Sequence, residues 1–124
     1  MDQIRVVREG TLEQAPVTAG MHRRGAAIAE DVNVLHVRTE PGAMSGWHHH
    51  GDCATYGFVL SGQLRFEFGP GGGDSVELQP GDAFLVPPGL VHREGNPGEA
   101  EQVLVALRVG PEPTVMNVSG PDAS

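Results

Sequence analysis

Short apolar segments separated by glycine and proline run along the whole chain. The clearest pattern spans residues 63–68, where Leu64, Phe66 and Phe68 alternate with charged residues. Alternation with a period of two predicts a half-buried antiparallel strand. Further strands are predicted at residues 32–39, 55–60, 75–78, 83–86 and 101–109, with a short edge strand at residues 4–7. Periodicity does not decide the structure of residues 8–31, and residues 93–100 are predicted to form a polar loop.

The spacing of turns indicates the fold class. Turn residues interrupt the apolar segments every eight to twelve residues or so, and no long segment has a helical period, which is typical of an all-β sandwich or barrel. The 18 glycines and 10 prolines fit tight turns between strands better than disorder. We predict a single domain over residues 1–124, made of an N-terminal arm with edge strands (1–31), a barrel core (32–109) and a C-terminal tail (110–124).

Composition limits the partners of the protein. Sixteen acidic residues face eight arginines and no lysine, which gives a formal charge of −8. This balance argues against nucleic acid or an anionic membrane as partner. The single cysteine, Cys53, forms no internal disulfide, and the N-terminus lacks the apolar region of a signal peptide. We therefore expect a soluble cytoplasmic protein.

Three histidines indicate the chemistry. His48 and His50 are two residues apart, just before the apolar segment at 55–60, and His92 follows Pro87-Pro88-Gly89 much later. Side chains at positions i and i+2 of a strand share one face, so His48 and His50 provide half of a metal site. Our hypothesis is that the fold brings His92 to them around one divalent metal.

Two motifs carry these histidines, and both closely resemble the motifs of the cupin family. The first places His-x-His and a ligand glutamate between two glycines, and the chain has a threonine where the family has that glutamate. The second matches at every position. The matching residues are Gly42, His48, His50, Thr55 and Gly62 in the first motif, and Gly81, Pro87, Gly89, His92 and Asn96 in the second.

The resemblance implies a jelly-roll β-barrel with a metal inside one end, held by His48, His50 and His92. It also implies a homodimer, because many cupins pair through edge strands or barrel faces. Cupin enzymes include dioxygenases, isomerases, epimerases and polyketide cyclases, while other members are not enzymes, so the fold leaves the reaction open.

Thr55 influences the expected chemistry, because a neutral hydroxyl leaves the double charge of the metal uncompensated. Such a centre favours an enolate, a carboxylate or a catecholate. Imidazole ligands do not distinguish Fe, Zn, Ni, Co, Cu or Mn. The leading hypothesis is a metal-dependent, dioxygenase-like enzyme, with Fe(II) or a similar ion, acting on a small anionic or enolisable molecule. The alternatives are a redox-neutral Zn-type cyclase or isomerase and a cupin that binds a small ligand without catalysis.

No residue is assigned a catalytic role from the sequence. His49 should point away from its neighbours by strand alternation, and Thr55 should lie beside the ligands. Tyr56 is favoured as a packing residue, and Glu94, two residues after His92, as a surface carboxylate. The candidates for positions beside the ligands or in the pocket wall are His49, Thr55, Tyr56, Phe66, Phe84 and Glu94.

Overall fold

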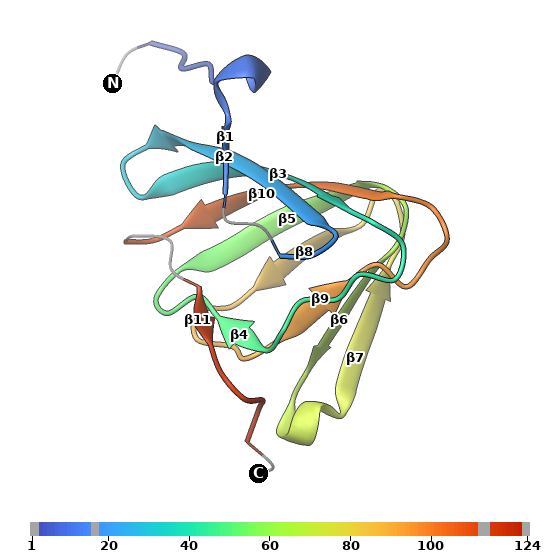
Figure 1. The fold of residues 1–124 in the computed structure, drawn as a ribbon. Coiled ribbons are helices and arrows are strands. Elements are labelled where there is room, and N and C mark those ends of the chain that lie inside the picture. The colour runs from blue at the N-terminus through green and yellow to red at the C-terminus, as the bar shows by residue number, and fades with distance from the viewer. Residues whose placement is uncertain (1–2, 16–17, 112–114, 123–124) are drawn as a thin grey trace.

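The computed structural model describes residues 3–15, 18–111 and 115–122. Within these residues the regular elements are antiparallel strands, apart from two single-turn 3-10 helices (Figure 1). None of the helices described has the length and the apolar character needed to cross a membrane. The elements are η1 (Glu9–Thr11), β1 (Glu13–Gln14), β2 (Met21–Ala29), β3 (Val32–Thr39), β4 (His48–His49), β5 (Ala54–Ser61), β6 (Leu64–Phe68), η2 (Pro70–Gly72), β7 (Asp74–Leu78), β8 (Ala83–Val86), β9 (Arg93–Gly95), β10 (Gln102–Val109) and β11 (Met116–Asn117).

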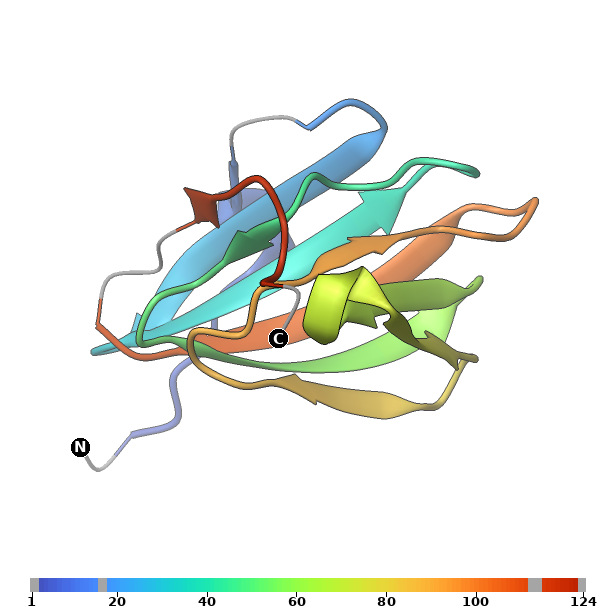
Figure 2. The ribbon, with the colours of Figure 1, turned by 90° about the horizontal axis from the view of Figure 1, so that it is seen from below.

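Two layers of sheet face each other. One layer is a six-stranded sheet in the order β1-β2-β3-β10-β5-β8. The other layer consists of a three-stranded sheet, β7-β6-β9, and the pair β11-β4. Figure 2 shows β4 and β9 side by side in front of the large sheet. The predicted all-β architecture is therefore confirmed, and these two strands bring the two histidine segments together.

The hydrophobic core lies between the two layers. Alternation along β5 turns Thr55 and Val59 inward, and β6 contributes Leu64 and Phe66 from the opposite layer. Val59 and Leu64 are fully buried, and the Phe66 ring stacks edge-on against Phe84 of β8 with 5.0 Å between ring centroids. The apolar core thus extends up to the polar side chains in the barrel interior, since Phe84 and Thr55 also line a cavity with them.

The main strands follow the sequence prediction, and the exceptions have physical reasons. Residues 4–7 form no strand, and Ile4 is 93% exposed, because this segment pairs with no neighbour among the described residues. The predicted loop at 93–100 begins with the short strand β9, which pairs with β6. Its three residues lack the apolar alternation by which a strand is predicted from sequence. Strand β2 lies inside the large sheet and not at its edge.

Candidate metal centre

The structure brings His48, His50 and His92 together at one end of the barrel. The backbones of His48 and His92 bond to each other twice, since each N–H donates to the other carbonyl at 2.9 Å. His50 follows directly after β4. All three side chains are buried, and one ring nitrogen of each lies within 4.8 Å of the others. Two segments more than forty residues apart therefore supply one group of three imidazoles.

Backbone carbonyls fix the orientation of two of these rings. His48 Nδ1 donates to the Gly46 carbonyl at 2.8 Å, and His92 Nδ1 donates to the Leu90 carbonyl at 2.9 Å. A carbonyl only accepts, so the proton sits on Nδ1 and the Nε2 lone pair is free to bind a cation. Burial also lowers the pKa of His92, which keeps that imidazole neutral. This donor set fits a divalent transition metal.

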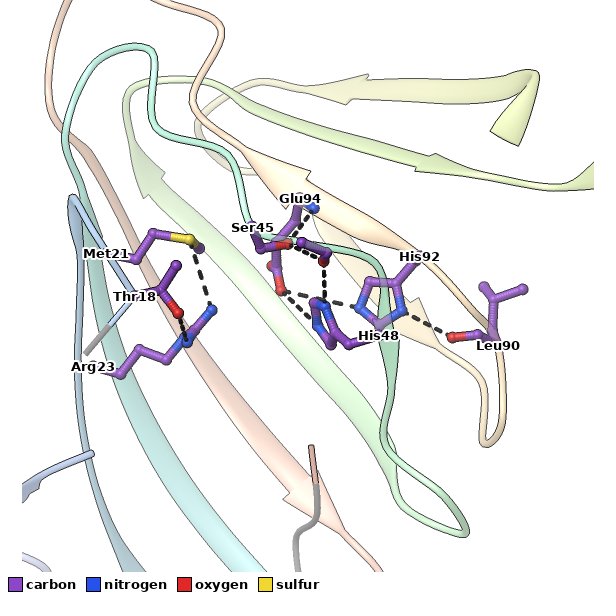
Figure 3. A network of polar contacts seen from close by, with 9 residues as sticks. Thr18, Met21, Arg23, Ser45, His48, Leu90, His92 and Glu94 are labelled. Carbon is purple, nitrogen blue, oxygen red and sulfur yellow. Dashed lines mark hydrogen bonds and ion pairs between the residues drawn. The ribbon is translucent and has the colours of Figure 1, made fainter. Parts of the chain in front are cut away.

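Glu94 faces the histidines from β9. Its Oε1 lies 3.7 Å from His48 Nε2 and 4.0 Å from His92 Nε2 (Figure 3). Ser45 holds the backbone of Glu94 on both sides, because Glu94 N donates to Ser45 Oγ and Ser45 N donates to the Glu94 carbonyl. The side chain is only 19% exposed, so the interpretation of Glu94 as a surface carboxylate was wrong.

The Glu94 carboxylate remains ionised despite its burial. Burial by itself would raise its pKa, but contacts with His48, His92 and Arg23 outweigh that effect and lower the pKa to about 2. A negative charge therefore lies beside the three imidazoles at any pH at which the protein is expected to work. It partly restores the acidic group that the family pattern has at the position of Thr55.

A small cavity of about 30 Å³ extends from the histidines into the barrel. Its polar lining includes His50, His92, Glu94, Thr55 and Arg108. A cavity of this size has room for at least one water molecule. The remaining lining residues are Arg23, Leu35, Val37, Phe84, Val86, Leu104 and Ala106.

The other predicted neighbours occupy different places. Phe66 is buried, with its ring centroid 6.0 Å from that of His92, and Phe84 lines the cavity, as expected of wall residues. Tyr56 is 49% exposed on the outer face, because alternation along β5 turns it opposite to Thr55; its place in the pocket is therefore corrected. His49 is half-buried beside β11, and its Nδ1 accepts a bond from Gly51 N.

Two arginines of the cavity were missed in the sequence. Arg108 follows Leu104 and Ala106 at even spacing along β10, so the alternation already placed it on the inner face of the strand. Arg23 lies on β2, in the region where periodicity gave no answer. The signal for Arg108 was therefore present in the sequence, and that for Arg23 was not.

Comparisons with known proteins agree with this geometry. The sequence profile of the Cupin domain matches residues 35–108, which include both histidine motifs. A germin-like protein of Arabidopsis thaliana, subfamily T member 3, is 29% identical over 89 residues, covering 70% of this chain. The match covers 39% of that relative, so the chain spans well under half of its length.

Solved structures share the fold. Oxalate decarboxylase from Bacillus subtilis, a protein with Mn(II) centres, matches 86% of this chain with a TM-score of 0.74 and 21% identity, and the match covers 30% of that protein. KdgF from a Halomonas species matches 89% of this chain and 96% of its own length, with a TM-score of 0.69 and 23% identity. A Klebsiella pneumoniae protein with a double-stranded β-helix domain matches 83% of this chain and 88% of its own length, with a TM-score of 0.70 and 22% identity. At these identities the likeness concerns the fold alone.

Proposed function

This chain belongs to the Cupin domain family, and from that premise we propose that it is a metal-dependent enzyme acting on a small anionic or enolisable organic molecule. The observation that carries the proposal is the group of three buried imidazoles, two of them with Nδ1 bound to carbonyls and Nε2 left free. A structural zinc site is usually closed by four ligands, often including cysteine. Three imidazoles beside a cavity instead favour a centre that accepts a substrate.

His48, His50 and His92 would hold the metal, and Glu94 is within reach as a fourth ligand. Its Oε1 lies 3.7 and 4.0 Å from two of the ring nitrogens, so the carboxylate is next to the atoms that would hold the ion. We therefore propose that an acidic group of the centre comes from β9, whereas the sequence alone, with Thr55, predicted a centre without a carboxylate.

When bound, such a metal supplies Lewis acidity, and Fe(II) would in addition allow chemistry with O₂. Oxygenation of an enolisable or phenolic substrate is the first candidate reaction, because three imidazoles leave room for further ligands. A redox-neutral isomerisation or cyclisation, for which the metal supplies the Lewis acid, is the second.

The deciding experiment begins with metal analysis of untagged protein purified without chelators. The Fe(II)-loaded protein is then offered diketones, flavonols and phenolic acids while O₂ consumption is recorded. The Zn(II)- and Mn(II)-loaded forms are offered enolisable acids in D₂O without oxygen, and NMR follows hydrogen exchange. Oxygen uptake that His92→Ala abolishes supports oxygenation, and anaerobic exchange that both His92→Ala and Glu94→Gln abolish supports the second reaction. Bound metal with neither result would favour the non-enzymatic, ligand-binding alternative.

We also propose that the protein forms a homodimer through the outer face of the large sheet. Phe58, Leu85 and Leu107 are exposed there on three neighbouring strands, β5, β8 and β10. An apolar face of this kind is typical of contact with a second copy of the chain. Light scattering coupled to gel filtration should give twice the chain mass for the wild type and the single mass for Phe58→Glu. The cytoplasmic location stays a prediction.

A further inference from the structure

We propose that Arg108, together with Thr55 and Arg23, forms a carboxylate-binding subsite beside the three histidines, so that the substrate is a small carboxylic acid. This inference rests on the proposed function and specifies the substrate class for the same site. The metal would hold the reacting end of the molecule, and the arginines would hold its carboxylate.

Two residues that line this cavity each have a buried polar atom without a hydrogen-bond partner among the described residues. Thr55 and Arg108 are directly opposite each other on β5 and β10, and both line the cavity. Thr55 is 7% exposed. Its Oγ1 and the Nε of Arg108 are both buried, and neither has a hydrogen-bond partner in the described part of the chain. Buried polar groups are nearly always paired, so two orphans lining one cavity indicate a ligand that completes them.

The charge of the cavity specifies an anion. Arg23 and Arg108 supply two positive charges, and Glu94 supplies one negative charge. Among the described residues, the Arg23 guanidinium donates to two neutral partners, Thr18 Oγ1 at 3.3 Å and Met21 Sδ at 3.7 Å (Figure 3). The interior therefore carries an excess positive charge before any metal ion adds to it. Burial disfavours such an excess unless an anion enters.

The donors of the site match a carboxylate. Arg108 and Thr55 line the same small cavity, so their donors can reach one head group. A guanidinium offers two parallel N–H donors that match the two oxygens of a carboxylate. The Thr55 hydroxyl can donate a further bond to one of those oxygens.

This arrangement also explains the departure of Thr55 from the family pattern. A glutamate at this position, which is a metal ligand in the family pattern, would also place the protein's own carboxylate beside Arg108. Threonine is shorter and neutral, so it leaves that space open and offers a hydroxyl donor, while Glu94 supplies a carboxylate to the same cavity. The site can therefore accept an external acid.

The test measures the binding of matched acids and amides to Co(II)-loaded protein. The probes are acetate, glyoxylate and pyruvate with their neutral amides, titrated by calorimetry and followed by the visible spectrum of Co(II). A carboxylate can also bind the metal directly, so the informative quantity is the change between wild type and Arg108→Gln. We expect Arg108→Gln to bind at least one of the acids about tenfold or more weakly than wild type does. Its affinity for the matching amide and for Co(II) should be unchanged. The matched control is Arg38→Gln, which removes the same charge from an exposed position and should behave as wild type.

Two further variants keep the inference testable if Arg108→Gln folds poorly by circular dichroism. Arg108→Lys retains the charge but not the two parallel N–H donors, and should lose part of the preference for acids over amides. Thr55→Glu should abolish that preference by filling the subsite. The inference is overturned if no acid binds wild type better than its amide, or if the variants keep the wild-type preference. Failure of the proposed function is a separate result: wild type then binds no Co(II), or His92→Ala binds it equally well.

Discussion

Two buried polar regions of this barrel differ in how completely their hydrogen bonds are made. Around Asn96, the amide nitrogen donates to the carbonyls of Thr39 and Ala100 at 3.0 and 2.8 Å, and the amide oxygen accepts from Gly98 N at 2.9 Å. Gln102, beside it, donates to two further backbone carbonyls. These side chains use their bonds to hold loops and strands together.

The cavity beside the histidines is the opposite case. Thr55 Oγ1 and Arg108 Nε are buried without a hydrogen-bond partner in the described part of the chain, and the Nε2 atoms of His48 and His92 face Glu94 at 3.7 and 4.0 Å. An unmade bond in a protein interior costs stability unless something enters to complete it. Thr39 Oγ1, next to Asn96, is also buried without a partner in the described part of the chain, but it does not line the cavity. The comparison teaches that the two unsatisfied groups that share one cavity, Thr55 and Arg108, mark the ligand site, whereas the amides of Asn96 and Gln102 hold the scaffold.

The largest expected effect removes a metal ligand. His92→Ala should weaken Co(II) binding by at least about a hundredfold, because one of three imidazoles is lost from the centre. Competition with a chromogenic chelator measures this change. His36→Ala, an exposed histidine on β3, is the control and should keep wild-type affinity. Equal affinity in both variants would contradict the assignment of the site.

The second prediction tests the comparison through stability. Asn96→Ala should lower the free energy of unfolding by about 2–4 kcal/mol, because it leaves two carbonyls and one N–H without partners. Thr55→Val keeps the side-chain volume and removes a hydroxyl that bonds to nothing, so its cost should be under about 1 kcal/mol, or it should be stabilising. Urea denaturation of the metal-free protein measures both. Equal losses would remove the distinction between the two regions.

A third prediction concerns Glu94 as a metal ligand. Glu94→Gln should reduce Co(II) affinity by about tenfold or more, because the amide is a weaker donor and carries no charge. The visible spectrum of Co(II) should also change, since it reports the ligands directly. Glu77→Gln, on the exposed side of β7, serves as the control. An unchanged spectrum would place the carboxylate outside the coordination sphere.

The smallest effect is expected from an ion-pair network outside the barrel interior. The hydrogen bond from Arg65, followed by that from Arg93, lowers the pKa of Glu67 below its ordinary 4.5. The pair therefore stabilises the folded state above the unfolded pKa, and this contribution is lost as the pH falls through the lower, folded pKa. Lowering the pH from about 5 to about 3 should therefore reduce the free energy of unfolding less in Glu67→Gln than in wild type. The difference between the two proteins should be less than about 1 kcal/mol. Thermal unfolding at several pH values measures the difference, and parallel curves would contradict it.

Much of the fold and the three histidines followed from the sequence. Alternating residues and turn spacing placed most of the strands, and the two motifs identified His48, His50 and His92, which the structure brings together. These signals succeed because a strand with one buried face must alternate, whichever strand it pairs with.

The remainder depended on tertiary pairing. Glu94 points inward because β9 pairs with β6, where Glu94 is opposite Phe66, and a three-residue polar strand gives no sign of this in the sequence. Arg108 could have been found, since its position on β10 matches the inward face. Arg23 could not, because β2 lacks a clear pattern and contains Gly25, which packs against Leu35.

The paired backbones of His48 and His92 have one more consequence. Their two mutual bonds, and the carbonyls that hold each ring, involve protein atoms alone, so the chain itself positions these two donors. Exchange of one cation for another should then proceed without unfolding, and the occupant in a living cell would be decided by which metals that cell supplies.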